Sequence, residues 1–283
     1  MMQEPKEPPR RKWVPTGTIR KEALSELSGL AASRQYPGIL WAHNDSGDHS
    51  RLFAIHADGS FVAEIEVEGA ANKDWEDIAL DGKTLYVADM GNNGNRRDDL
   101  CLYKLTEPEP KNSSVKAQKI RVAYPDQAEF PPKKTEWRYD CESLFVFRGK
   151  LHVLTKHRLA GSPFFPSDST VLYRLDREDR KKVNTLMRLD SHTQLGGWVT
   201  AADCSPDGKT LAVLTHLPVA SVWLFELSGV GDKLLSKPVK RQVFQGAKQC
   251  EALCFLDNQT LLLGNEQREL CRVELLTLAW QRL

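Results

Sequence analysis

Acidic side chains open several of the apolar runs in this sequence. Glu76, Glu142 and Glu251 each begin a run, for example EDIALDGKTLYVADM, and Asp203 lies two positions into a fourth run. A carboxylate in an apolar setting is costly unless it is paired, hydrogen-bonded or bound to a cation. Carboxylate and amide oxygens are the ligands that Ca²⁺ and Mg²⁺ prefer. We therefore predict a divalent-cation site with Glu76, Asp203 and Glu251 as ligands.

A second set of polar residues follows the returning strand of each repeat and would complete this site. A bound cation would polarise a carbonyl or phosphoryl oxygen, with Glu142 or His216 as general base and Lys156 beside them. The predicted ligand-binding residues are Asn44, Asp45, Asp89, Asn92, Arg96 and Glu266. Arg96 and Lys156 would suit an anionic group of a substrate. The pattern thus predicts a hydrolase that acts on a small lactone, ester or phosphoester.

Two other functions fit the same residues. Paired carboxylates also serve carbohydrate chemistry, and Trp75, Trp137, Tyr139 and Trp198 lie where they could stack on a sugar ring. A scaffold without catalysis is the third interpretation, since the long loop from Lys156 to Ser169 carries Phe164 and Phe165 beside two prolines.

Several other catalytic classes lack their motifs. The sequence contains no HExxH pattern and no Cys/His cluster for zinc, and no GxSxG nucleophile elbow. The segment GNNGNRR follows a predicted strand but opens no helix, so it is not a phosphate-binding loop.

Five similar segments predict the elements that carry these residues. They start at Ser28, Glu76, Glu142, Ala201 and Glu251, and each reads as a strand, a tight turn and a second strand. Two further strands follow most of them. Four strands repeated in this way form the blade of a β-propeller. We therefore predict an all-β fold, a single β-propeller of five four-stranded blades, with six as the alternative.

The repeat also indicates where the polar residues meet. The first strand of a blade starts at the same end of the central channel where the second strand finishes, so both sets of residues face one mouth. The turns at the opposite end, such as Asp81-Gly82-Lys83, are ordinary turn formers. Residues 1–15 form a flexible polar arm and residues 16–283 the propeller, with the segment WVPTGTIR adding a strand to the last blade.

Composition narrows the choice of partners. The 283 residues include 39 Lys and Arg against 38 Asp and Glu, a net charge of +1, which does not indicate a nucleic-acid or membrane-surface partner. No run approaches the length of a membrane helix, and the six cysteines form no CxxC pair. These features predict a monomer that binds a small molecule in the cytoplasm. Export is the alternative if a signal peptide has been removed.

The ordered motifs resemble a family of largely uncharacterised bacterial β-propeller proteins. The resemblance rests on SGLAAS with WAHNDSGD, DWEDIA with LYVADMGNN, CESL with LTK, VTAADCSPDGKTLAV, and CEAL with GNE. It runs from Glu26 to Glu274 and implies the propeller fold.

A more distant similarity is to gluconolactonase- and paraoxonase-like propellers. In that family a Glu at the start of an inner strand, with Asn and Asp, holds a divalent cation on the axis. The resemblance implies that Glu76, Glu142 or Glu251 fills the Glu role, and the strand of Asp203 is similar to the SPDGKTLYV segment of the family. This sequence has Thr200-Ala201-Ala202-Asp203 where the family has a Pro-Asn-Gly, and the family has six blades.

Overall fold

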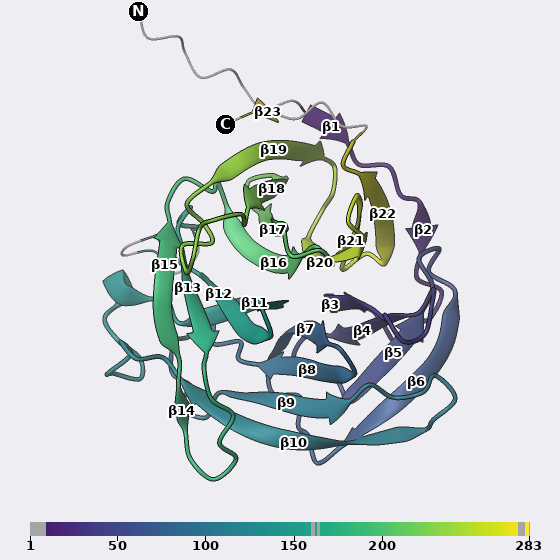
Figure 1. The fold of residues 1–283 in the computed structure, drawn as a ribbon, viewed down its shortest axis with the longest axis horizontal. Coiled ribbons are helices and arrows are strands. Elements are labelled where there is room, and N and C mark those ends of the chain that lie inside the picture. The colour runs from purple at the N-terminus through teal and green to yellow at the C-terminus, as the bar shows by residue number, and fades with distance from the viewer. Residues whose placement is uncertain (1–9, 160–161, 163–164, 277–280, 283) are drawn as a thin grey trace, which may run out of the picture.

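The computed structural model describes residues 10–159, 162, 165–276 and 281–282. Phe164 and the first nine residues of the N-terminal arm lie outside this part of the chain. In the described part, the strands form five antiparallel four-stranded units around a common axis (Figure 1). The prediction of an all-β propeller is confirmed.

Each unit takes its strands from consecutive segments of the chain, apart from one short strand of the last unit. The first unit contains β3 (Leu27–Ala32), β4 (Leu40–Asn44), β5 (Arg51–Ile55) and β6 (Phe61–Glu68). The second contains β7 (Trp75–Asp81), β8 (Thr84–Asp89), β9 (Cys101–Thr106) and β10 (Ser114–Ala123). The third contains β11 (Asp140–Phe147), β12 (Lys150–Lys156), β13 (Thr170–Leu175) and β15 (Met187–His192). The fourth contains β16 (Trp198–Cys204), β17 (Thr210–His216), β18 (Ala220–Glu226) and β19 (Pro238–Gln245). The fifth contains β20 (Cys250–Asp257), β21 (Thr260–Asn265), β22 (Glu269–Glu274) and β2 (Gly17–Thr18).

The first strands of the five units, β3, β7, β11, β16 and β20, surround the axis and pack against one another in a closed ring (Figure 1). One cluster of buried apolar side chains lies between each pair of neighbouring units, including the pair that joins the fifth unit to the first. These five layers are the core of the molecule. Burial between sheets explains why the first and second strands are almost continuously apolar.

The long interval between Glu76 and Glu142 was the predicted place for a sixth blade. It holds the remaining strands of the second unit and a short 3₁₀ helix, η1 (Lys134–Glu136), with no further four-stranded unit in this described segment. The outer strand β10 is long enough to pair in parallel with β6 at its N-terminal end and with β14 (Asn184–Thr185) at its C-terminal end.

Strand β2 (Gly17–Thr18) adds to the last unit, as the sequence predicts, but Arg10 to Trp13 are packed on the ring and not part of a flexible arm. Strand β2 pairs antiparallel with β22, and β1 (Arg10–Lys12) pairs in parallel with β19. Trp13 between them is 5% exposed and packs edge-on against Phe244. The sequence predicts that LAWQRL is a strand of the fifth blade, and this segment lies partly outside the described residues. Its described portion, β23 (Gln281–Arg282), pairs with β19 of the fourth unit instead, which corrects this expectation.

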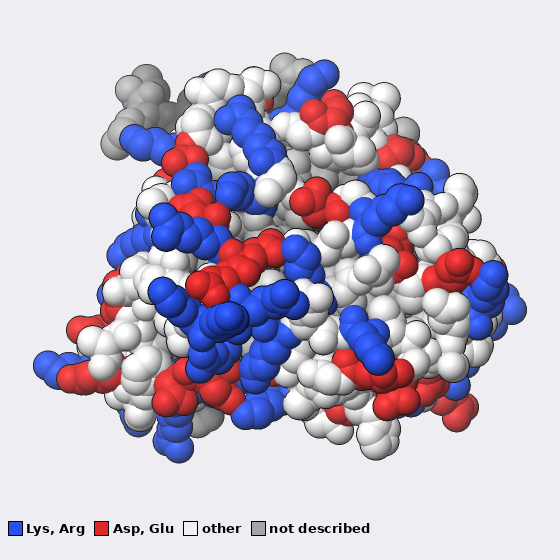
Figure 2. Space-filling view, turned by 60° about the horizontal axis from the view of Figure 1, so that its bottom comes forward, with Lys and Arg blue, Asp and Glu red and all other residues white. Residues whose placement is uncertain are grey.

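The surface shows both signs of charge. Figure 2 shows Lys and Arg side chains interspersed with Asp and Glu side chains over the face that it presents. No helix among the described residues is long and apolar enough to cross a membrane.

Candidate functional site

The first strand of every unit carries a β-bulge at the same depth. At this point one extra residue stands between two successive pairs with the second strand. A bulge leaves the extra residue unpaired and turns its side chain in a new direction. All five extra residues line one cavity of about 390 Å³: Ser28, Glu76, Glu142, Thr200 and Glu251. The three glutamates therefore meet at one mouth of the channel, as the repeat predicts.

The two hydroxyl residues of this ring connect neighbouring units. The Ser28 hydroxyl donates a hydrogen bond to the backbone oxygen of Glu76 at 2.6 Å, and the Thr200 hydroxyl donates to that of Cys250 at 2.9 Å. In the fourth unit, Thr200 therefore occupies the position in the ring of glutamates where the comparison of the five repeats predicted Asp203.

Asp203 lies at the other end of the channel, three residues further along β16. Its carboxylate accepts the backbone N–H groups of Cys204 and Phe255, both at 2.8 Å, so that it links the fourth and fifth units. It lines a separate cavity of about 320 Å³ beside the far turns. The expectation that Asp203 stands beside the glutamates is therefore corrected.

Two carboxylates that the sequence analysis did not single out complete the acidic cluster. Asp45, Asp74 and Glu76 bring one oxygen each to within 4.8 Å of one another, and so do Glu76, Asp140 and Glu142. Glu76 belongs to both groups. The signal for the missed residues was an Asp-x-Glu spacing at the start of two of the repeated segments, at Asp74 to Glu76 and at Asp140 to Glu142.

Glu76 is the central residue of the cluster and has an unusual environment. Glu76 is 6% exposed, and its carboxylate makes no hydrogen bond or ion pair with any residue that the structure describes. Burial, and then the charge of Glu142, raises the pKa of Glu76 well above its ordinary value. Gly91 packs directly against this carboxylate, where a Cβ atom would overlap Glu76 Oε1 and stand 2.6 Å from Asp74 Oδ2.

The neighbouring acidic groups also have raised pKa values. Burial raises the pKa of Asp74 to about 7, with the charges of Asp45 and Asp140 adding to the effect. Burial likewise raises the pKa of Glu251 to about 7 and that of Asp45 above its ordinary value. A site with this many buried carboxylates must bind protons or a cation to lower its charge repulsion.

Lys156 is the cation that reaches into the cavity. Its side chain is 12% exposed, forms an ion pair with Glu142 and lies 3.6 Å from Asp140 Oδ2. Its ammonium also lies 5.5 Å from the centre of the Trp198 ring, and Trp198 lines the cavity. Burial alone lowers the pKa of Lys156, but the surrounding carboxylates outweigh it and raise the pKa above its ordinary value.

The rest of the cavity wall contains three further predicted residues: Asp45, His216 and Glu266. Burial lowers the pKa of His216, and its buried Nδ1 atom has no hydrogen-bond partner among the described residues. Glu266 accepts a hydrogen bond from the Gln249 amide at 2.5 Å. Together with Glu76, Glu142, Glu251 and Lys156, seven of the predicted site residues therefore line this cavity, and their roles stay predictions.

Other predicted ligand-binding residues support loops instead. The Asn44 amide donates to Ala23 and Asp48, and its oxygen accepts the backbone N–H of Glu26. Asn92 accepts the backbone N–H of Arg97 and donates its own backbone N–H to Asp140. Neither asparagine lines the cavity.

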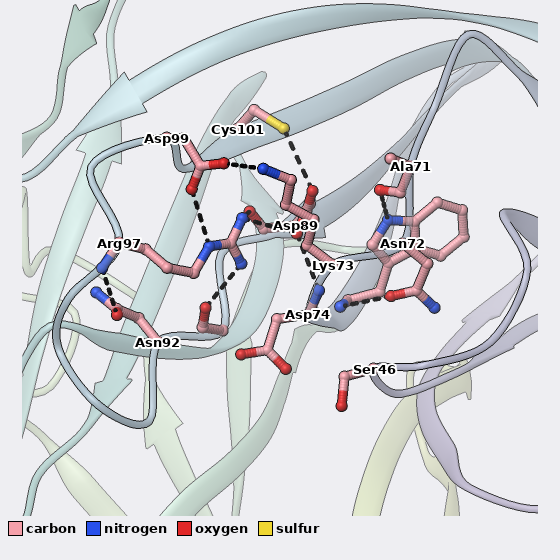
Figure 3. A network of polar contacts seen from close by, with 12 residues as sticks. Ser46, Ala71, Asn72, Lys73, Asp74, Asp89, Asn92, Arg97, Asp99 and Cys101 are labelled. Atoms are coloured by element: carbon pink, nitrogen blue, oxygen red, sulfur yellow. Dashed lines mark hydrogen bonds and ion pairs between the residues drawn. The ribbon is translucent and has the colours of Figure 1, made fainter.

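Asp89 lies within a polar network behind the site (Figure 3). It accepts hydrogen bonds from Arg97 at 3.0 Å and from the backbone N–H of Asp74 at 3.1 Å. Arg97 also bonds to Asp99, which forms an ion pair with Lys73. Figure 3 shows these cations turned toward Asp89 and Asp99, whereas the Asp74 carboxylate points away from them.

Arg96, which the sequence placed in the pocket, is exposed and does not line the cavity. Of the four predicted stacking aromatics, only Trp198 lines it. Trp75 and Tyr139 are fully buried between units, and the indole of Trp137 donates to the backbone of Pro132. These positions give no platform of several aromatic rings for a sugar.

No protein-family model and no curated protein matches this chain, so the resemblance to the bacterial propeller family stays a prediction. Solved structures that are similar to it include a gluconolactonase from Xanthomonas campestris, with 12% identity over 88% of this chain and 71% of that chain and a TM-score of 0.46. A hydrazine synthase from Kuenenia stuttgartiensis is 12% identical over 87% of this chain and 70% of that one, with a TM-score of 0.47. The protein U3-55K is 13% identical over 88% and 67%, with a TM-score of 0.45.

Proposed function

We propose that this propeller is a hydrolase that uses one divalent cation, held by Asp45, Asp74 and Glu76, to cleave a small lactone or ester. The observation that carries the proposal is the Glu76 carboxylate. It is buried at the wall of a cavity, lies close to two other carboxylates, and has no partner among the described residues. A buried charge of this kind is stable only with a proton or a cation beside it.

The residues fit such a cation in three respects. The donors are all carboxylate oxygens, which suit Ca²⁺, Mg²⁺ or Mn²⁺ rather than zinc. They come from two segments, the residue after β4 and the start of β7, which the fold brings together, so the site exists only in the folded protein. Gly91 leaves the space that lets Glu76 and Asp74 approach each other. The cation, when bound, would supply Lewis-acid polarisation of a carbonyl oxygen.

The remaining cavity residues would handle the proton and orient the substrate. Glu251 has a pKa of about 7, so it can accept and return a proton at neutral pH. His216 stays neutral, because burial lowers its pKa, and its Nδ1 atom is available as an acceptor or donor. Trp198 provides the apolar side of the cavity.

The charge of the cavity wall favours a neutral substrate. Asp45, Glu251 and Glu266 face the cavity as acidic groups, and the Lys156 charge is already engaged by Glu142. Arg96 does not reach the cavity, so the expected basic site for an anionic group is incomplete. We therefore place neutral lactones and esters ahead of phosphoesters.

The test is a panel of lactones, carboxylic esters and phosphoesters, assayed with chelated protein and after addition of Ca²⁺, Mg²⁺ or Mn²⁺. The proposal predicts hydrolysis of a neutral lactone or ester that needs the metal and falls by about 10³-fold or more in Glu76→Gln. Glu109→Gln, at an exposed position, is the matched control and should retain activity. Hydrolysis that survives both chelation and Glu76→Gln would contradict the proposal.

A further inference from the structure

The two carboxylate groups of the cluster share Glu76, which places it where a bridging ligand stands in a two-cation centre. One group is Asp45, Asp74 and Glu76, and the other is Glu76, Asp140 and Glu142. In two-metal hydrolases, the ions lie about 3.5–4 Å apart and are held by carboxylates in this way. The cluster alone does not establish two ions. The buried and unpartnered carboxylate of Glu76, which lines the cavity, is the independent sign that a cation is missing beside it.

The second group is already paired with cations, since Arg158 lies 3.5 Å from Asp140 Oδ2 and Lys156 lies between Asp140 and Glu142. The Lys156 ammonium contacts Glu142 and lies 3.6 Å from Asp140 Oδ2. Its position is fixed by the fold, because Lys156 is the last residue of β12 and pairs directly with Asp140, the first residue of β11. Trp198 packs against the ammonium from the next unit.

The first group has no cation of its own in the described part of the chain. The nearest basic residues on the Asp74 side, Lys73 and Arg97, are engaged by Asp99 and Asp89. Their side chains turn away from the Asp74 carboxylate (Figure 3). Basic side chains therefore contact Asp140 and Glu142 on one side of Glu76, whereas Asp45 and Asp74 on the other side form no ion pair in the described part of the chain.

We propose that the Lys156 ammonium occupies the second cation position of a two-cation centre, so that the protein binds a single metal ion beside it. This inference rests on the proposed metal site at Asp45, Asp74 and Glu76. The ammonium would face the substrate from the side opposite the metal ion, as a fixed positive charge that cannot dissociate.

The inference predicts that removal of Lys156 creates a second metal site. In Lys156→Ala, Glu142 loses its cation and Asp140 keeps only Arg158, at 3.5 Å from its Oδ2, while both carboxylates keep their oxygens near Glu76. This leaves a position for a second ion. Wild-type protein dialysed against Mn²⁺ should retain about one ion per chain, and Lys156→Ala about two. The electron paramagnetic resonance spectrum should change from that of isolated Mn²⁺ to that of a coupled pair. Lys156→Arg keeps the charge and should stay at one ion.

The double variant Lys156→Ala, Glu142→Gln is the matched control and should return to about one ion per chain. Lys156→Ala is expected to melt below wild type in chelator, because it leaves the buried Glu142 carboxylate without a cation. Mn²⁺ should restore its stability. A Lys156→Ala protein that does not fold even with Mn²⁺ would therefore contradict the inference.

The two proposals fail differently. If wild type binds no metal, the proposed function is wrong, and the inference falls with it. If wild type binds one ion and Lys156→Ala also binds only one, the metal site stands and the role of Lys156 is wrong. Two ions in wild type would likewise overturn it.

Discussion

Gly91→Ala tests the proposed metal site without changing any of its ligands. The added methyl would overlap Glu76 Oε1 and stand 2.6 Å from Asp74 Oδ2, whereas an ordinary contact needs about 3.5 Å. One or both carboxylates must therefore move by about 1 Å. Metal–ligand distances tolerate only about 0.2 Å, so we expect the site to lose a ligand and its affinity to fall by about 100-fold.

This loss of affinity converts into a thermal shift. A metal at about 100 times its dissociation constant should stabilise the wild type by about 2.7 kcal/mol, which raises Tm by about 5–10 °C for a domain of this size. At the same concentration, a site weakened by about 100-fold gains about 0.4 kcal/mol, or about 1 °C. The assay is a thermal melt in chelator and again with excess Ca²⁺ or Mn²⁺.

Gly94→Ala provides the control, because its added methyl would make only an ordinary 3.6 Å contact with the Arg96 side chain in the same loop. It should keep the full metal-induced rise in Tm. The reasoning is refuted if Gly91→Ala keeps that rise as well.

Three further predictions concern the ring and its pH dependence. Asp77→Ala removes the acceptor of two backbone N–H groups, on Ile78 and Leu144, and should lower the free energy of unfolding by about 2–4 kcal/mol in urea titrations. Trp13→Ala should cost about 3–5 kcal/mol by the same measurement, because the buried indole fastens the N-terminal segment to the last units. Burial raises the pKa of Glu251 from 4.5 to about 7, so the folded state binds the proton more tightly than the unfolded state. Metal-free protein should therefore lose stability as pH rises through this interval, and Glu251→Gln should make the loss smaller in thermal melts.

The first two of these predictions have a control on an exposed side chain. Asp81→Ala changes an exposed carboxylate of the same strand as Asp77, and Val14→Ala changes a residue that is 55% exposed beside Trp13. Both should change stability by less than about 0.5 kcal/mol. Equal losses in test and control variants would show that the buried contacts are not the cause. A pH profile that is unchanged in Glu251→Gln would contradict the assignment of that group.

The fold was predictable because each unit repeats a local signal. Apolar first and second strands joined by turns such as Asp81-Gly82 set the unit, and the N-terminal segment was recognisable as the closing strand. The pairing of β23 was not, because β22 pairs with β2 and β19 pairs with β1 as well as with β23, and only the folded ring decides which edge the last segment meets.

The site was only partly predictable because it depends on the bulges. Eight residues separate the bulge from the second strand at Glu76 and Thr84 and at Glu142 and Lys150, but ten separate Thr200 from Thr210. The segment between the bulge and the second strand is two residues longer in the fourth unit. A spacing of eight residues before Thr210 therefore falls next to Asp203 and not on Thr200. Asp74 and Asp140 join the acidic cluster only through contacts between neighbouring units, and the sequence of a single repeat does not show these contacts.

The most direct test of the central claim is a crystal structure of the protein soaked in Mn²⁺, with anomalous diffraction to locate the ion. The account predicts one strong anomalous peak per chain between Asp45, Asp74 and Glu76, at about 2.0–2.6 Å from their oxygens, and no peak in a crystal of Glu76→Gln. An empty cluster at saturating Mn²⁺, or a peak only at the far end of the channel beside Asp203, would contradict it.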